Sequence, residues 1–88
     1  MEAKNNTILV VDDDHDFLVI IRQILVKKGY EIQTAPSASE AISLLKDKFY
    51  NAAILDISLP DADGTELLSR IIEMHPDIIA IMLTGHSS

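Results

Sequence analysis

Three acidic side chains and one hydroxyl stand where short apolar runs of the chain come to an end. Asp12 and Asp13 directly follow one such run, Asp56 closes a second, and Thr84 follows a third. Short apolar runs that end in turn residues are typical of buried strands. If the strands are parallel, their carboxyl ends share one edge of a sheet, where open α/β sheets place their chemistry. We therefore expect these four side chains to meet.

The chemistry open to such a group is phosphoryl transfer. Clustered carboxylates repel one another unless a cation lies between them, and Mg²⁺ favours carboxylate and water oxygens. With a metal neutralising developing charge, one aspartate can act as nucleophile and form an acyl phosphate. The Thr84 hydroxyl can then hydrogen-bond to the phosphoryl group. For Asp56 taken alone, an ordinary strand-terminal acid that caps a loop is the alternative.

The elements that position these residues alternate between strand and helix. We predict strands over residues 7–11, 31–35, 52–56 and 78–83. Asp14, Ser37 and Asp63 are candidate helix N-caps, the last two followed three residues later by glutamate in a capping-box pattern. This alternation indicates βαβ units with right-handed crossovers and a parallel sheet, so the predicted fold class is α/β.

Apolar residues recur in the three predicted helices at steps of three and four, and we expect them to face the core. They are Phe17, Ile20, Ile21, Ile24 and Leu25 in the first helix, Ala38, Ala41, Ile42 and Leu45 in the second, and Leu67, Leu68, Ile71 and Ile72 in the third. The strand over 7–11 has no polar face, as expected of a central strand covered on both sides. The helices after the first and third strands should cover opposite faces of the sheet.

Composition narrows the classes of function. The 88 residues allow one small domain, and 14 acids against 7 bases give a net charge of −7. That charge argues against nucleic-acid binding by this segment and fits a cation site, with a solvated acidic surface as the alternative. The absence of cysteine excludes disulfides and thiolate metal sites. Neither a signal peptide nor a membrane span is indicated, so the expected location is the cytoplasm.

Three sequence blocks carry a family resemblance. They are VVDDD at 10–14, LDISLPDADG at 55–64 and MLTG at 82–85, and in order and spacing they resemble the receiver domain of two-component response regulators. The resemblance spans essentially the whole chain and implies a flavodoxin-like (CheY-like) three-layer sandwich. It also implies a phosphoacceptor in a phosphorelay rather than a turnover enzyme. The phosphoryl donor would be a sensor histidine kinase or histidine phosphotransfer protein, and phosphorylation would switch a partner or output domain.

The resemblance assigns roles to individual residues. Asp56 would be the phosphoacceptor. Asp13 would bind Mg²⁺ directly and Asp12 largely through water, with Asp56 and the backbone carbonyl of Ser58 completing the protein ligands. Thr84 would be the switch hydroxyl that moves toward the phosphoryl group.

The sequence also departs from the family pattern. A complete receiver continues through a fourth helix, a fifth strand and a fifth helix, and its fifth strand brings a lysine that pairs with the phosphoryl group. This sequence stops at Ser88, so we expect residues 1–88 to be a receiver truncated after its fourth strand, with slow or absent phosphorylation. In the family's strand order, 2-1-3-4-5, the strand over 78–83 then becomes an exposed edge, which invites pairing with another chain. A receiver-shaped module that acts by dimerisation or strand exchange is therefore the alternative function.

A rival motif lies in the loop after Asp56. Asp61-Ala62-Asp63-Gly64-Thr65 resembles the signature of haloacid-dehalogenase-type phosphatases, whose first aspartate directly follows a buried strand. Here the predicted strand has already ended at Asp56, so we expect Asp61 to be a loop residue. His75 and His86 show no metal-ligand spacing, and we expect both at the surface.

Overall fold

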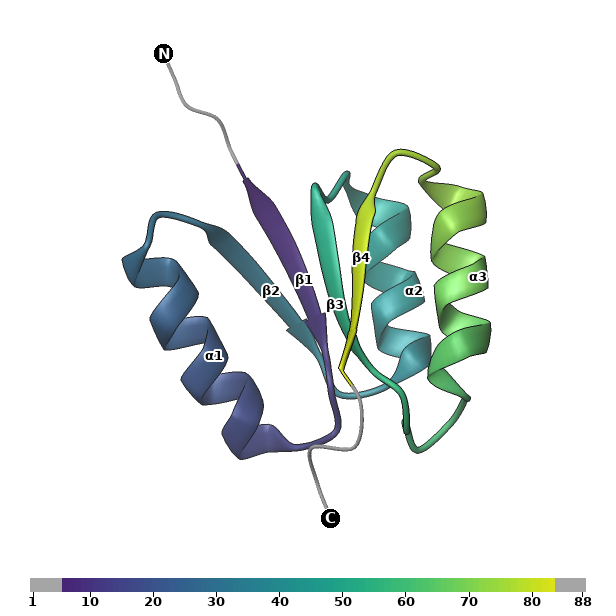
Figure 1. Ribbon diagram of the computed structural model, residues 1–88, viewed down its shortest axis with the longest axis horizontal. Coiled ribbons are helices and arrows are strands. Elements are labelled where there is room, and N and C mark those ends of the chain that lie inside the picture. Colours follow the sequence, from purple (N-terminus) through teal and green to yellow (C-terminus); the bar gives the residue numbers. More distant parts are fainter. Residues whose placement is uncertain (1–5, 84–88) are drawn as a thin grey trace.

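The computed structural model describes residues 6–83, which form four strands and three helices (Figure 1). In chain order they are β1 (Thr7–Val11), α1 (His15–Lys27), β2 (Glu31–Ala35), α2 (Ala38–Asp47), β3 (Ala52–Asp56), α3 (Gly64–Met74) and β4 (Ile79–Leu83). The predicted alternation is confirmed, with β4 beginning one residue later than predicted. Ile78 is buried just before that strand.

All four strands are parallel, in the order β2-β1-β3-β4. The five residues of β1 are buried, as predicted for a central strand. Figure 1 shows α1 on one face of the sheet and α2 and α3 on the other, so the molecule has three layers. The predicted flavodoxin-like arrangement is therefore confirmed for the part of the chain that the structure describes.

The core is divided between the two faces of the sheet because strand side chains alternate in direction. Leu9 and Val11 belong to the larger cluster, which α2 and α3 cover. Ile8 and Val10 belong to the smaller cluster, which is completed by Leu18 of α1. The central strand thus joins both halves of the core.

The predicted core stripe of α1 is partly wrong. Ile20 and Ile24 are 55% and 46% exposed, whereas Leu18, which lay outside the predicted stripe, is buried. The helix packs mainly over β2, so only its flank with Leu18 and the predicted residues Phe17, Ile21 and Leu25 reaches the core. In α3 the same correction applies to Ile72, which is 47% exposed.

Each helix begins directly after its predicted N-cap residue. The Asp14 carboxylate accepts from the Phe17 amide at 3.1 Å, and the Ser37 hydroxyl accepts from the Glu40 amide at 3.3 Å. The Asp63 carboxylate accepts from both the amide and the hydroxyl of Thr65, each at 2.9 Å. Such bonds satisfy amides that have no partner within the helix. The two bonds from Thr65 also hold the pKa of the Asp63 carboxyl below its ordinary value, since they favour the charged form.

The edge of the sheet that β4 forms is apolar. Among residues 6–83, β4 pairs only with β3, and its Ile79 and Ile81 are 64% and 47% exposed. The predicted exposed edge is therefore present in the described structure, while pairing with a second chain stays a prediction. No helix within residues 6–83 combines the length and apolar character needed to cross a membrane.

One buried hydroxyl offers a test of the core. Tyr50 is fully buried, and its hydroxyl has no hydrogen-bond partner among the described residues. A buried polar group without a partner costs about 1–3 kcal/mol. Tyr50→Phe is therefore expected to raise the free energy of unfolding by about 1 kcal/mol, measured by urea denaturation.

The matched control is Tyr30→Phe, because the Tyr30 side chain is only half-buried. That change is expected to leave the free energy of unfolding nearly unaltered. A loss of stability in Tyr50→Phe would contradict the account of its hydroxyl.

Candidate functional site

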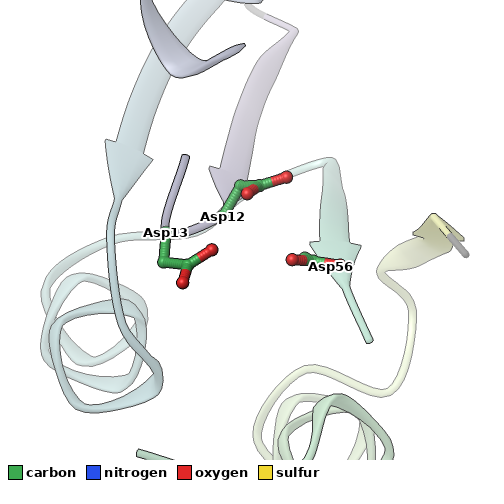
Figure 2. A group of neighbouring side chains, drawn as sticks. All are labelled: Asp12, Asp13 and Asp56. Carbon is green, nitrogen blue, oxygen red and sulfur yellow. The ribbon is translucent and has the colours of Figure 1, made fainter. Parts of the chain in front are cut away.

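The adjacent carboxyl ends of β1 and β3 bring three of the predicted acids together. Val11 pairs with Leu55, so Asp12 and Asp56 follow at the same level of the sheet, with Asp13 beside them. One carboxylate oxygen from each acid lies within 4.8 Å of the other two. Figure 2 shows the carboxylates of Asp13 and Asp56 directed toward one another, with that of Asp12 close by.

The three acids differ in exposure. Asp12 is fully buried and Asp56 is 7% exposed, whereas Asp13 is exposed. One oxygen of the Asp12 side chain accepts from the Asp14 amide at 2.9 Å, which fixes its orientation. Buried carboxylates need such partners or a cation. The arrangement is a shielded pair of carboxylates with a third acid on the side that faces solvent.

The loop over residues 57–63 begins beside the cluster, directly after Asp56. The Ser58 amide donates to the Asp56 carboxylate at 3.4 Å, and Ser58 also forms an isolated antiparallel bridge with Asp63. The backbone of Ser58 therefore lies beside the cluster, and metal binding by its carbonyl stays a prediction.

Thr84 lies outside the residues that the structure describes. The residue before it, Leu83, pairs with Asp56, and the Leu83 carbonyl accepts from the Ile57 amide at 3.3 Å. The end of β4 is thus next to Asp56. The switch role of Thr84 stays a prediction.

Gly64 is required by the close approach of α3 to the end of β3. Its amide donates to the Ile57 carbonyl at 2.7 Å. A Cβ at this position would lie 2.5 Å from the carbonyl oxygen of Asp56 and 2.7 Å from the Cα of Ile57. The structure therefore gives a physical reason for glycine at position 64.

Asp61 has a role that the sequence reasoning missed. Its carboxylate accepts from the Ala38 amide at 2.8 Å and from the Ser39 amide at 3.0 Å, at the start of α2. These backbone bonds hold the pKa of the Asp61 carboxyl below its ordinary value. The partners lie 23 and 22 residues away in the sequence, so no local pattern could have indicated them.

His75 also differs from its prediction as a surface residue. It is half-buried, its ring Nε2 lies 3.0 Å from the Leu45 carbonyl oxygen, and it meets the Phe49 ring edge-on. These contacts join the end of α3 to α2. His75 is therefore a packing residue; His86 lies outside the described residues.

Comparison with protein families gives one match across most of the chain. The family model described as "Response regulator receiver domain" matches residues 8–88. The C4-dicarboxylate transport transcriptional regulatory protein DctD of Rhizobium meliloti (strain 1021) is 34% identical over 80 residues. That alignment covers 91% of this chain but 17% of the relative, so the chain spans less than a fifth of that protein's length.

Two solved proteins share the fold. A response regulator receiver domain protein (CheY-like) from Methanospirillum hungatei JF-1 is 41% identical with a TM-score of 0.91, over 97% of this chain and 68% of the other. Response regulator protein TrrA from Thermotoga maritima, solved in complex with Mg²⁺-BeF, is 35% identical with a TM-score of 0.85, over 93% and 71% of the two chains. TrrA has also been solved in complex with histidine kinase ThkA, with a TM-score of 0.85 at 35% identity over 94% of this chain and 72% of that one.

Proposed function

Because this chain belongs to the response regulator receiver domain family of two-component signalling modules, we propose that Asp56 accepts a phosphoryl group from a histidine kinase or histidine phosphotransfer protein in a Mg²⁺-dependent reaction. The observation that carries the proposal is the convergence of Asp12, Asp13 and Asp56, whose carboxylate oxygens lie within 4.8 Å of one another. An isolated strand-terminal acid would not have two further acids at this distance.

The donor set fits a hard divalent cation. Three carboxylates, two of them buried, offer only oxygen ligands, and Mg²⁺ takes oxygen ligands from one or two carboxylates, water and phosphate. The ion would be held by Asp13, Asp12, Asp56 and the Ser58 carbonyl. When bound, the ion supplies positive charge that offsets the charge on the phosphoryl oxygens. The complex of TrrA with Mg²⁺-BeF supports this choice of metal.

In the proposed reaction, a carboxylate oxygen of Asp56 attacks the phosphorus atom of the donor. A new oxygen–phosphorus bond forms while the bond to the donor's leaving atom breaks, which gives an acyl phosphate. The Asp56 carboxylate is held beside the Ser58 amide, so the nucleophile is oriented before the donor arrives. The complex of TrrA with the kinase ThkA supports a histidine kinase as the donor.

Phosphorylation would alter the ends of β3 and β4 together, since Ile57 and Leu83 share a backbone hydrogen bond. We propose that the Thr84 hydroxyl moves toward the phosphoryl group. This movement shifts the equilibrium between two conformations of a surface that a partner or output domain recognises. The chain covers 17% of DctD, a transcriptional regulatory protein, and this supports the proposal of an output domain. We further propose that residues 1–88 correspond to the receiver through its fourth strand, without the lysine of a fifth strand.

Intact-mass spectrometry tests the proposed function. The chain is incubated with MgCl₂ and acetyl phosphate, in parallel with a chimaera in which the C-terminal third of the Methanospirillum hungatei receiver follows Ser88. We expect one added phosphoryl group on the chimaera, slower addition or none on this chain, and no addition when a chelator removes the metal. An unmodified chimaera would contradict the proposal, and rapid addition to this chain would contradict the expected need for the lysine.

Metal binding gives a separate prediction. Mg²⁺ is expected to raise the melting temperature of the chain, because a ligand that binds only the folded state stabilises it. Asp13→Asn should remove most of that gain. In the absence of metal, Asp13→Asn should melt at or above the temperature of the unchanged chain, because one repulsive charge is gone.

The matched control for the metal prediction is Asp16→Asn. Asp16 carries the same charge three residues later, in the first turn of α1, outside the cluster. Its replacement should leave the Mg²⁺-dependent gain intact. If Mg²⁺ raised the melting temperatures of Asp13→Asn and Asp16→Asn equally, the ion would be binding a diffuse acidic surface.

A second candidate function is favoured by the apolar edge of the sheet. Ile79 and Ile81 are 64% and 47% exposed on β4, and an unpaired apolar edge can add a strand from a second copy. Light scattering across protein concentration tests this alternative. A strictly monomeric, well-folded chain would contradict it.

A further inference from the structure

The carboxylate of Asp61 joins the loop over residues 57–63 to the first turn of α2. Its two oxygens accept separate backbone hydrogen bonds, from the Ala38 amide at 2.8 Å and from the Ser39 amide at 3.0 Å. A two-oxygen contact of this kind fixes both the distance and the orientation of the carboxylate. Negative charge at the start of a helix is also favoured by the helix dipole.

Asp61 completes the hydrogen bonding of the α2 N-terminus. The Glu40 amide donates to the Ser37 hydroxyl, and the Ala41 amide donates to the Ser37 carbonyl at 3.1 Å. The first two amides of the helix donate to Asp61 instead. Ser37 and Asp61 therefore divide one cap between them, and only Asp61 belongs to another segment of the chain.

The same loop is closed at its base beside Asp56. Gly64 donates to the Ile57 carbonyl at 2.7 Å, and Ser58 bridges to Asp63. Near the tip of the loop, the bonds from Asp61 tie it to α2. The loop that begins with Ile57 and Ser58 is thus held both at its base and near its tip, directly after the proposed phosphoacceptor.

We infer that Asp61 is a positioning residue, whose carboxylate fastens the loop over 57–63 to α2 and so fixes the backbone of Ile57 and Ser58 beside Asp56. The consequence for metal binding rests on the proposed function, because the Ser58 carbonyl is one of the proposed ligands. The attachment of the loop to α2 does not depend on the proposed function. This residue acts through the loop and has no part in the chemical step.

The test compares Asp61→Ala with Ser37→Ala, since both remove cap bonds from the same helix end but only the first releases the loop. In the metal-free protein, amide hydrogen exchange at Gly64 reports the bond to Ile57. We expect faster exchange at Gly64 in Asp61→Ala and exchange like that of the unchanged chain in Ser37→Ala. Asp61→Asn keeps one acceptor oxygen and should fall between them, and it serves as the variant for the test if Asp61→Ala does not fold.

The second readout is the dissociation constant for Mg²⁺. Loss of a group that orients metal ligands typically weakens metal binding by about 10–100-fold, so Asp61→Ala should weaken it about tenfold and Ser37→Ala hardly at all. If the unchanged chain binds no Mg²⁺, the proposed function fails, while exchange at Gly64 still decides the role of Asp61. If both alanine variants lower the melting temperature alike and leave Gly64 exchange unchanged, Asp61 is only a helix cap and the inference is overturned.

Discussion

Asp56→Asn is expected to abolish phosphoryl incorporation altogether. The amide has nearly the shape of the carboxylate and can still accept from the Ser58 amide, which lies 3.4 Å from the carboxylate. It lacks the anionic oxygen that attacks phosphorus, so no acyl phosphate can form. Intact mass after incubation of the chimaera with MgCl₂ and acetyl phosphate measures the result.

The matched control for this prediction is again Asp16→Asn, which removes one carboxylate from α1 without touching the cluster. In the chimaera, this variant should be phosphorylated as fast as the chimaera with Asp16 unchanged. Phosphorylation of Asp56→Asn at an undiminished rate would show that another residue accepts the group.

Gly64→Ala is expected to lower the free energy of unfolding by about 3 kcal/mol, although alanine normally favours a helix over glycine by about 1 kcal/mol. The added methyl would lie 2.5 Å from the Asp56 carbonyl oxygen and 2.8 Å from that of Ile57. Both are backbone atoms, so relief requires movement of the β3 end itself. Urea denaturation at neutral pH measures the loss.

Gly29→Ala is the matched control for this clash. Gly29 has a positive φ of 99°, but a Cβ there would meet nothing within 4 Å. Its replacement should cost about 1 kcal/mol through backbone strain alone. A Gly64→Ala protein as stable as Gly29→Ala, or more so, would contradict the close approach of α3 to the site.

Much of the fold was predictable because its determinants are local. The apolar run of β1 and the N-cap residues Asp14, Ser37 and Asp63 each act within a few residues of their own position. Strand order followed from the family resemblance. The acidic cluster was predictable for a related reason. The carboxyl ends of neighbouring parallel strands lie at the same edge of the sheet, which brings Asp12 and Asp56 together without any contribution from the loops.

The predictions that were wrong or missing depend on distant partners. The spacing of Ile20 and Ile24 indicates which residues share a side of α1, but not how much of that side the sheet covers. Asp61 finds its amides on α2, and His75 finds a carbonyl at Leu45, 30 residues away. A one-dimensional pattern carries no signal for such contacts.

The most direct measurement of the central claim is the location of the phosphoryl group on the chain. The phosphorylated chimaera is reduced with borohydride, which converts an aspartyl phosphate into homoserine, and its peptides are then sequenced by mass spectrometry. The account predicts homoserine at position 56 alone, and only after incubation with Mg²⁺. Homoserine at position 12 or 13, or a phosphate retained on a hydroxyl such as that of Ser58, would contradict it.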